Sequence, residues 1–129
     1  MNFPAGLKYS EQHEWVRVEG DEAVIGITDF AQDSLGDVVH VELPQVGATI
    51  EAHANAAEVE SVKAVSDVYA PLGGEVVAVN EDLDGNEERI NKDPYGDGWL
   101  FRIRLADAAD LDKLMDAAAY ETFAAQAHH

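Results

Sequence analysis

The sequence predicts a mainly β fold, a compact barrel or sandwich with a short internal helix and helices at the C-terminal end. Short apolar-rich runs recur at close spacing and are broken by Gly, Pro, Asp and Asn, which is typical of short strands joined by turns. A chain of 129 residues with 47% hydrophobic residues can bury one core. We therefore expect a single domain over residues 1–129, with its core at about 14–105 and a helical segment at about 107–127.

The first predicted elements are a hairpin and a short helix. The runs "HEWVRVEG" and "EAVIGIT" flank a Gly20-Asp21 turn signal, which predicts two paired antiparallel strands. The run "DFAQDSLG" begins with Asp29, has Gln32 three residues later and ends at Gly36. This pattern predicts one or two helical turns with a capping box at the start and a glycine stop.

The rest of the chain alternates predicted strands with punctuation. The further strands are expected in "DVVHVEL", "ATIEA", "AEVESV", "DVYA", "EVVAV" and "WLFRIRL". The polar run "NEDLDGNEERINKDPYGDG" predicts a surface loop with room for one helical turn, and its end, "DPYGDGW", a turn into the last strand. After Asp107, apolar residues at helical spacing predict one broken or two short helices that pack on the strands, namely Leu111, Leu114, Met115, Tyr120 and Phe123.

The formal net charge of −18 restricts the partners of this protein. Phosphates of nucleic acid and anionic membrane surfaces would be repelled, so we expect neither as a partner. Acidity also improves solubility, which is a simpler explanation of the same charge. The chain contains no cysteine, lacks an apolar run of membrane-spanning length and begins without a signal-peptide pattern, so we expect a cytoplasmic location.

One of the four lysines, Lys63, stands in an acidic and apolar run, "AEVESVKAVSDVYAPLGGEV". The flanking runs predict a hairpin with this lysine at its tip. The tip has no Gly, Asn or Asp, so a type I turn is favoured over a primed turn with positive φ. The similar stretches "PQVGATIEA" and "PLGGEVVAV" lie on either side of Lys63. An ordinary solvated lysine would not explain this symmetry, whereas a lysine presented for acylation would.

The stretch around Lys63 resembles the corresponding stretch of a known protein family. "ESVKA" between two glycine-containing half-units is similar to the lipoyl- and biotinyl-carrier domains, and valine and alanine beside the lysine match the glycine cleavage H proteins. The resemblance covers nearly the whole chain, in the stretches "LKYSEQHEWVRVEG", "VIGITDFAQDSLGDVVHVELPQVGATI", "AEVESVKAVSDVYAPLGGEVVAVNEDL", "IN" and "DPYGDGWLFRI". It implies a barrel-sandwich hybrid fold of the lipoyl/biotinyl-carrier kind.

The resemblance also implies a function. Lys63 would carry lipoic acid in an amide bond, and the protein would be a non-catalytic carrier of the glycine cleavage system. Its partners would be the glycine decarboxylase (P protein), the aminomethyltransferase (T protein) and the dihydrolipoamide dehydrogenase (L protein). The arm would shuttle the aminomethyl group of glycine and reducing equivalents among these enzymes. A lipoate-attaching enzyme would recognise Glu60, and the carrier would be a monomer.

Family members fold the loaded arm into a surface cleft. The carboxylates that hold its amine map onto Glu14 and Asp67, with His13 and Ser66 as further cleft lining. The alternative for both acids is an ordinary position at a strand end. We expect Gly47 and Gly74 to serve turn geometry, and Trp15, Trp99 and Tyr95 to anchor the core or a loop.

The sequence departs from the family pattern in two places. Leu72-Gly73-Gly74 follows Pro71 where Ser-Gly is usual, and "GNEER", with Arg89, replaces a proline and an apolar residue.

Other functions fit this sequence less well than the carrier function does. "DLDGNEE" has the composition of a calcium loop, but its glycine comes too early for an EF-hand, and the histidines have no metal-ligand spacing. We therefore expect no metal site. The chain lacks a Gly-x-Ser-x-Gly elbow and a cysteine nucleophile, which argues against a hydrolase. A relay that passes lipoyl groups to other proteins would use the same Lys63, so the sequence leaves that alternative open.

Overall fold

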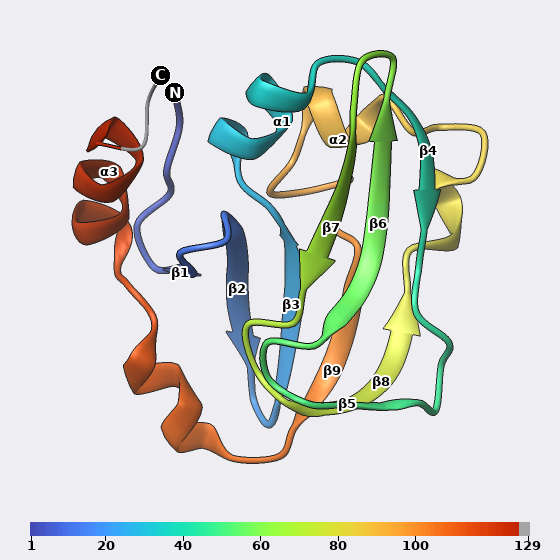
Figure 1. Cartoon of the computed structure of the whole chain (residues 1–129). Helices are drawn as coiled ribbons and strands as arrows, with labels where there is room; N and C mark the ends of the chain where they lie inside the picture. Colours follow the sequence, from blue (N-terminus) through green and yellow to red (C-terminus); the bar gives the residue numbers. More distant parts are fainter. Residues whose placement is uncertain (127–129) are drawn as a thin grey trace.

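The computed structural model describes residues 1–126 and consists of two antiparallel β-sheets packed face to face, with helices at one end and along one side (Figure 1). The six-stranded sheet has the order β1-β2-β3-β9-β8-β5. Its strands are β1 (Lys8–Tyr9), β2 (Glu14–Glu19), β3 (Glu22–Ile27), β5 (Thr49–Ile50), β8 (Gly74–Val79) and β9 (Phe101–Leu105). The three-stranded sheet has the order β4-β6-β7, with β4 (Val38–Glu42), β6 (Asn55–Ser61) and β7 (Val65–Tyr69). This architecture confirms the predicted mainly β, barrel-sandwich fold.

The β2–β3 hairpin and helix α1 (Asp29–Leu35) form where the sequence predicts them. The predicted N-cap of the helix was wrong by one residue. Thr28, not Asp29, is the N-cap, because its side chain accepts a hydrogen bond from the Ala31 backbone N–H. Gly36 ends the helix with φ 80°, a conformation that glycine adopts without steric cost.

The two similar stretches beside Lys63 supply strands that pair with each other. In the β5–β8 ladder, Thr49 lies opposite Glu75 and Ile50 lies opposite Gly74. Gly47 has a positive φ of 94°, as the turn prediction requires. The explanation of Gly74 by a turn was wrong, since Gly74 is the first residue of β8 and a Cβ there would collide with the Arg104 carbonyl oxygen. The residue is glycine because two strands approach closely at this point.

The main core lies between the two sheets, and apolar side chains of the otherwise polar segment after β8 contribute to it. Leu72, the departure from the family pattern after Pro71, is fully buried in this core. The prediction of a surface loop over the polar segment was partly wrong. It contains the 3₁₀ helix η1 (Glu81–Leu83) and the short helix α2 (Arg89–Lys92), and these insert Leu83 and Ile90 into the core.

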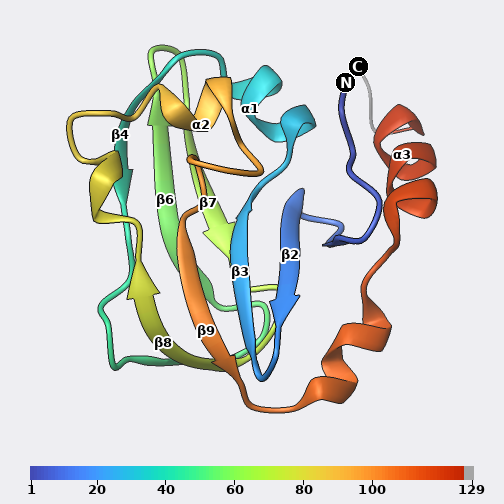
Figure 2. The same cartoon turned by 180° about the vertical axis from the view of Figure 1, so that it is seen from behind.

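A second apolar cluster lies on the other face of the β2–β3 hairpin, beneath the C-terminal helix. The C-terminal segment forms η2 (Ala108–Lys113) and α3 (Ala117–Gln126), which confirms two short helices; residue 127 lies outside the described residues. Figures 1 and 2 show α3 on the outer side of β2 with the N-terminal segment between them, and α3 contacts β1. Tyr120 of α3 stacks on Tyr9 with a centroid distance of 4.7 Å. Trp15 is fully buried in the same cluster and donates to the Pro94 carbonyl, as its predicted anchoring role requires.

None of the helices within residues 1–126 is both long enough and apolar enough to cross a bilayer.

Candidate functional site

Lys63 lies at the tip of the β6–β7 hairpin, which projects beyond both sheets towards α1 and α2 (Figure 1). The Ser61 N–H donates to the Ala64 carbonyl at 2.8 Å, and neither of the two residues between them has a positive φ. The primed turn is therefore absent, as predicted from the lack of Gly, Asn and Asp. The Ser61 hydroxyl organises the turn, because it accepts from the backbone N–H groups of Lys63 (3.3 Å) and Ala64 (3.1 Å).

The tip is also anchored to the rest of the protein. The Val62 N–H donates to the Asp37 carbonyl at 3.0 Å, which ties the turn to the start of β4. The aliphatic part of Lys63 lies close to Gly36, at the end of α1. Within residues 1–126 no carboxylate lies within 4.0 Å of the Lys63 ammonium. The lysine is thus exposed, lies on a hydrogen-bonded turn and has no ion pair with the part of the chain that the structure describes.

A cleft of about 310 Å³ begins beside this turn and runs between β7 and α1. Its lining starts at Ala64 and Val65, directly after the lysine, and ends at Gln12, His13 and Glu14. Apolar side chains form much of its walls, namely Ile27, Phe30, Leu35, Val59 and Val68. Four residues singled out from the sequence line this one cleft: Glu14, Asp67, His13 and Ser66. Glu60 does not line it and lies on the neighbouring strand β6, opposite Val65.

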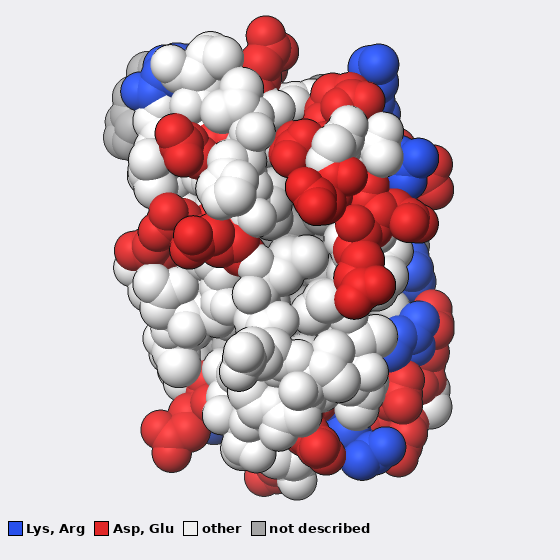
Figure 3. Space-filling view, turned by 90° about the vertical axis from the view of Figure 1, so that its right-hand side faces the viewer, with Lys and Arg blue, Asp and Glu red and all other residues white. Residues whose placement is uncertain are grey.

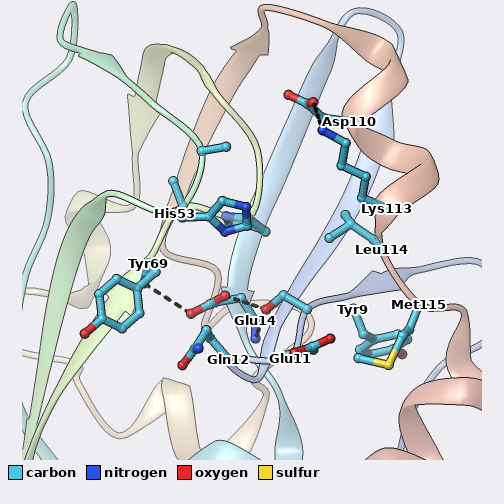
Figure 4. Close-up of a pocket in the computed structure, with 14 residues that line it drawn as sticks. Tyr9, Glu11, Gln12, Glu14, His53, Tyr69, Asp110, Lys113, Leu114 and Met115 are labelled. Carbon is cyan, nitrogen blue, oxygen red and sulfur yellow. Dashed lines mark hydrogen bonds and ion pairs between the residues drawn. The ribbon is translucent and has the colours of Figure 1, made fainter.

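Glu14 is the most unusual residue of the cleft, because its side chain is a carboxylate that is only 1% exposed. One oxygen accepts from the Ser10 hydroxyl, and Oε2 accepts from the Tyr69 backbone N–H at 3.1 Å (Figure 4). Tyr69 belongs to β7, an edge strand whose outer N–H groups need partners. Glu14 therefore joins the six-stranded sheet to the edge of the three-stranded sheet at the floor of the cleft.

Burial also changes the acidity of Glu14. Desolvation raises its pKa from 4.5 to about 7, and the hydrogen bonds from Ser10 and Tyr69 offset part of this effect. Each carboxylate oxygen has a second lone pair, so a further donor can bind without displacing Ser10 or Tyr69. A cation that entered the cleft would stabilise the ionised carboxylate.

Asp67 contributes the second acidic side chain of the cleft. It lies on β7 opposite Glu58 of β6, and Glu58 in turn lies opposite Glu42 of β4. Like charges directly opposite each other are destabilising in a sheet. An added cation near Asp67 would relieve part of this repulsion.

His13 is held in a conformation that non-glycine residues seldom adopt, with φ 68°. Its ring stacks on Phe30 with a centroid distance of 4.7 Å, and Nδ1 lies 2.7 Å from the Tyr120 hydroxyl. Burial lowers the pKa of the imidazole, so the ring is neutral at physiological pH.

A second cavity of about 250 Å³ lies on the other side of Glu14, under η2 (Figure 4). It shares Gln12 and Glu14 with the first cleft and is closed by Lys113, which lies 3.5 Å from Asp110. It does not reach the turn that carries Lys63, because Tyr69, at the far end of β7, is the part of the β6–β7 hairpin that lines it. Metal ligands were also sought, and residues 1–126 hold no group of three or more His, Cys, Asp or Glu side chains that could bind a metal ion.

Sequence reasoning missed several residues of the site. Ser61 could have been found, because serine is favoured at the start of a tight turn. Ser10 and the Tyr69 backbone could not, since their contact with Glu14 depends on the packing of two sheets. Tyr120 was predicted only to pack on the strands. Its hydrogen bond with His13, 107 positions away, leaves no signal in the sequence.

A lysine presented on a hairpin turn of a two-sheet β fold, beside a cleft that can shelter an attached group, defines the class of carrier domains with a modified lysine. Comparison with known proteins gives the family. Residues 7–127 match the family model described as glycine cleavage H-protein. The chain therefore belongs to the glycine cleavage H-protein family, and with it to the lipoyl carriers of the glycine cleavage system.

Individual relatives agree with this assignment. The glycine cleavage system H protein of Chromobacterium violaceum is 61% identical over 120 residues, which covers 92% of this chain and 94% of the relative. That of Symbiobacterium thermophilum is 56% identical over 122 residues, covering 95% of both chains. The crystal structure of a glycine cleavage system H protein from Mycobacterium marinum superposes with a TM-score of 0.85 at 38% identity, covering 92% of this chain and 96% of that one.

Proposed function

We propose that Lys63 carries lipoic acid in an amide bond and that the adjoining cleft shelters the arm in its loaded state. The observation that supports this most directly is the continuity between the two features. The lysine has no ion pair within the described residues, and the cleft begins at the next residue and ends at two carboxylates, Glu14 and Asp67. A solvated surface lysine has no reason to lie at the mouth of such a cleft.

The turn fits the attachment of an acyl group. Amide formation removes the positive charge of Lys63, and because no carboxylate of residues 1–126 pairs with that charge, no ion pair among them is lost. The Ser61 hydroxyl and the Val62 N–H hold the turn, so the attaching enzyme meets one reproducible conformation. When bound, the lipoyl group would supply a disulfide ring that opens on reduction, so that one sulfur could carry the aminomethyl group of glycine while the other is held as a thiol.

The cleft residues have separate tasks in this proposal. Ile27, Leu35 and Val59 exclude water, which protects a cargo that hydrolysis would release. Glu14 and Asp67 bind the ammonium of the loaded arm by charge-assisted hydrogen bonds. His13 and Ser66 line the path between the tip and these acids.

The protein is a carrier and performs no catalysis of its own in this proposal. It acts as a monomer, in the cytoplasm, and presents the arm in turn to the P, T and L proteins. The lipoate-attaching enzyme recognises Glu60, one strand away from the modified lysine. Acidic side chains gather mainly in the upper half of the face shown in Figure 3, while Lys and Arg side chains lie along its right-hand edge and at its upper left, which supports docking on partner surfaces with basic patches.

Reconstitution with the three partner enzymes tests the proposal. After treatment with a lipoate ligase, lipoate and ATP, the protein should support glycine decarboxylation, and Lys63→Arg should abolish it. The matched control is Lys92→Arg, which changes an exposed lysine on α2 and should retain full activity. Activity in Lys63→Arg would refute the proposal. Transfer of lipoyl groups to other carriers without the P protein would instead favour a lipoyl relay.

A further inference from the structure

A chain of three buried or half-buried groups joins the C-terminal helix to the cleft. The Tyr120 hydroxyl lies 2.7 Å from His13 Nδ1 and 2.8 Å from Thr28 Oγ1. His13 lines the cleft, and Thr28 caps helix α1, which forms one of its walls. Tyr120 is fully buried. Its two partners are distant in the sequence, 107 residues away for His13 and 92 residues away for Thr28. One hydroxyl from α3 therefore contacts both the lining and the wall of the cleft.

The positions of the protons follow from the hydrogen-bonding capacity of each group. Thr28 is fully buried, and among residues 1–126 its hydroxyl has one other partner, the Ala31 N–H, which is itself a donor. The Thr28 proton therefore has only the Tyr120 oxygen as an acceptor. Tyr120 must then donate its own proton to His13 Nδ1. The opposite direction would leave the buried Thr28 proton without an acceptor, which is costly.

Both rings are in the protonation state that this arrangement needs. Burial lowers the pKa of the His13 imidazole, so Nδ1 is free to accept at neutral pH. Burial also raises the pKa of Tyr120 to about 12, so the phenol keeps its proton.

We propose that Tyr120 is a positioning residue of the arm cleft: its hydroxyl holds His13 in the neutral tautomer that carries the proton on Nε2, and fixes the start of α1 in the same hydrogen-bond chain. This inference rests on the proposed function of the cleft. It extends that function by assigning a role to the C-terminal helix, which contributes no residue to the lining of the cleft.

The tautomer determines what His13 can bind. An Nε2–H group is a donor, so it suits the acceptors of the arm, which are the amide carbonyl oxygen and the sulfur atoms. It cannot accept from an ammonium. The cationic end of the cargo is therefore left to Glu14 and Asp67, and the imidazole serves a different part of the arm.

Nitrogen NMR of the unmodified protein tests the assignment directly. In the wild type, His13 Nδ1 should resonate as an unprotonated ring nitrogen and Nε2 as a protonated one. In Tyr120→Phe the two nitrogens should give the averaged signals of mixed tautomers. The matched control is Tyr9→Phe, which removes a phenol hydroxyl from the same aromatic cluster, one that donates to the Pro4 carbonyl and does not contact His13.

Each result of these measurements supports or overturns the positioning role of Tyr120. A proton on Nδ1 in the wild type overturns the assignment even if Tyr120→Phe fails to fold, and so does an unchanged tautomer in a folded Tyr120→Phe. In the lipoylated protein, loss of the aminomethyl cargo to water should be roughly threefold to tenfold faster in Tyr120→Phe than in the wild type or Tyr9→Phe. Equal rates in all three proteins would contradict a role in sheltering the arm. If Lys63 accepted no lipoyl group, the proposed function would fail while the tautomer could still be measured.

Discussion

Replacement of Glu14 by glutamine should change the stability of the protein in a pH-dependent way. Burial raises the pKa of Glu14 from 4.5 to about 7, so the folded protein binds this proton more tightly than the unfolded chain does. The stability of the wild type therefore falls as pH rises from about 4.5 to about 7, and above that range the buried carboxylate is ionised. Glutamine resembles the neutral carboxyl in shape and carries no charge, so this penalty disappears in Glu14→Gln.

The size of the effect follows from the two pKa values. At ~1.36 kcal/mol for each pKa unit, the full penalty is about 3 kcal/mol, and about 2 kcal/mol of it develops between pH 5.5 and pH 8.5. The free energy of unfolding of Glu14→Gln should thus rise by about 2 kcal/mol relative to the wild type over this range. Urea unfolding of both proteins at the two pH values measures this difference, and the titration of the other acidic groups cancels in the comparison.

A neighbouring acid provides the control. Glu11 is exposed on the same turn, so Glu11→Gln should keep a constant difference from the wild type at both pH values. If Glu14→Gln also kept a constant difference, Glu14 would be ionised at pH 5.5 as readily as an ordinary glutamate. Burial would then not raise the pKa of Glu14, which would refute the reasoning.

Four further substitutions and a change of salt concentration have expected outcomes that thermal or urea unfolding and binding kinetics can check. Gly74→Ala should destabilise the fold by about 3 kcal/mol, because the new Cβ would collide with the Arg104 carbonyl oxygen. Gly85→Ala, at φ 86° but with open space around it, should cost only about 1–2 kcal/mol; equal losses would remove the close-approach explanation. Thr28→Ala should cost about 1–2 kcal/mol through loss of the α1 cap, and an unchanged stability would contradict that role. Leu72→Ala should cost about 2–5 kcal/mol, since the side chain is fully buried; a small loss would show that the site can collapse around the cavity. The rate of association with a partner enzyme should fall as salt rises, and a flat salt profile would exclude steering by the acidic surface.

The sequence predicted those parts of the fold that depend on local patterns. The β2–β3 hairpin, helix α1 and the strands on either side of Lys63 follow from alternating apolar residues and turn signals. The helix cap was misplaced by one residue because Asp29 is itself a good cap, and only the structure shows which side chain meets the Ala31 N–H. The two-residue strand β1 was missed, because it exists only through its pairing with β2.

The parts that the sequence did not predict depend on packing between distant segments. The segment before β9 is polar in composition, yet it buries Leu83 and Ile90, since two apolar side chains in a polar run give no periodic signal. The burial of Glu14 could likewise not be predicted from the sequence, because its hydrogen-bond partners come from the preceding turn and from β7. The candidate cleft residues Glu14, Asp67, His13 and Ser66 were predicted only from the resemblance to the H-protein family. They line one cleft because β7 packs near α1, and this packing cannot be predicted from the sequence.

Lys63 is the proposed site of lipoyl attachment, and the mass of the protein and of its peptides tests this site without any partner enzyme of the glycine cleavage system. Treatment with a lipoate ligase, lipoate and ATP should add one lipoyl group, confined to the peptide that contains Lys63 and absent from Lys63→Arg. If a folded protein and a competent ligase gave no adduct, or an adduct on another lysine, Lys63 would be an ordinary exposed hairpin lysine and the carrier mechanism proposed for it would be wrong.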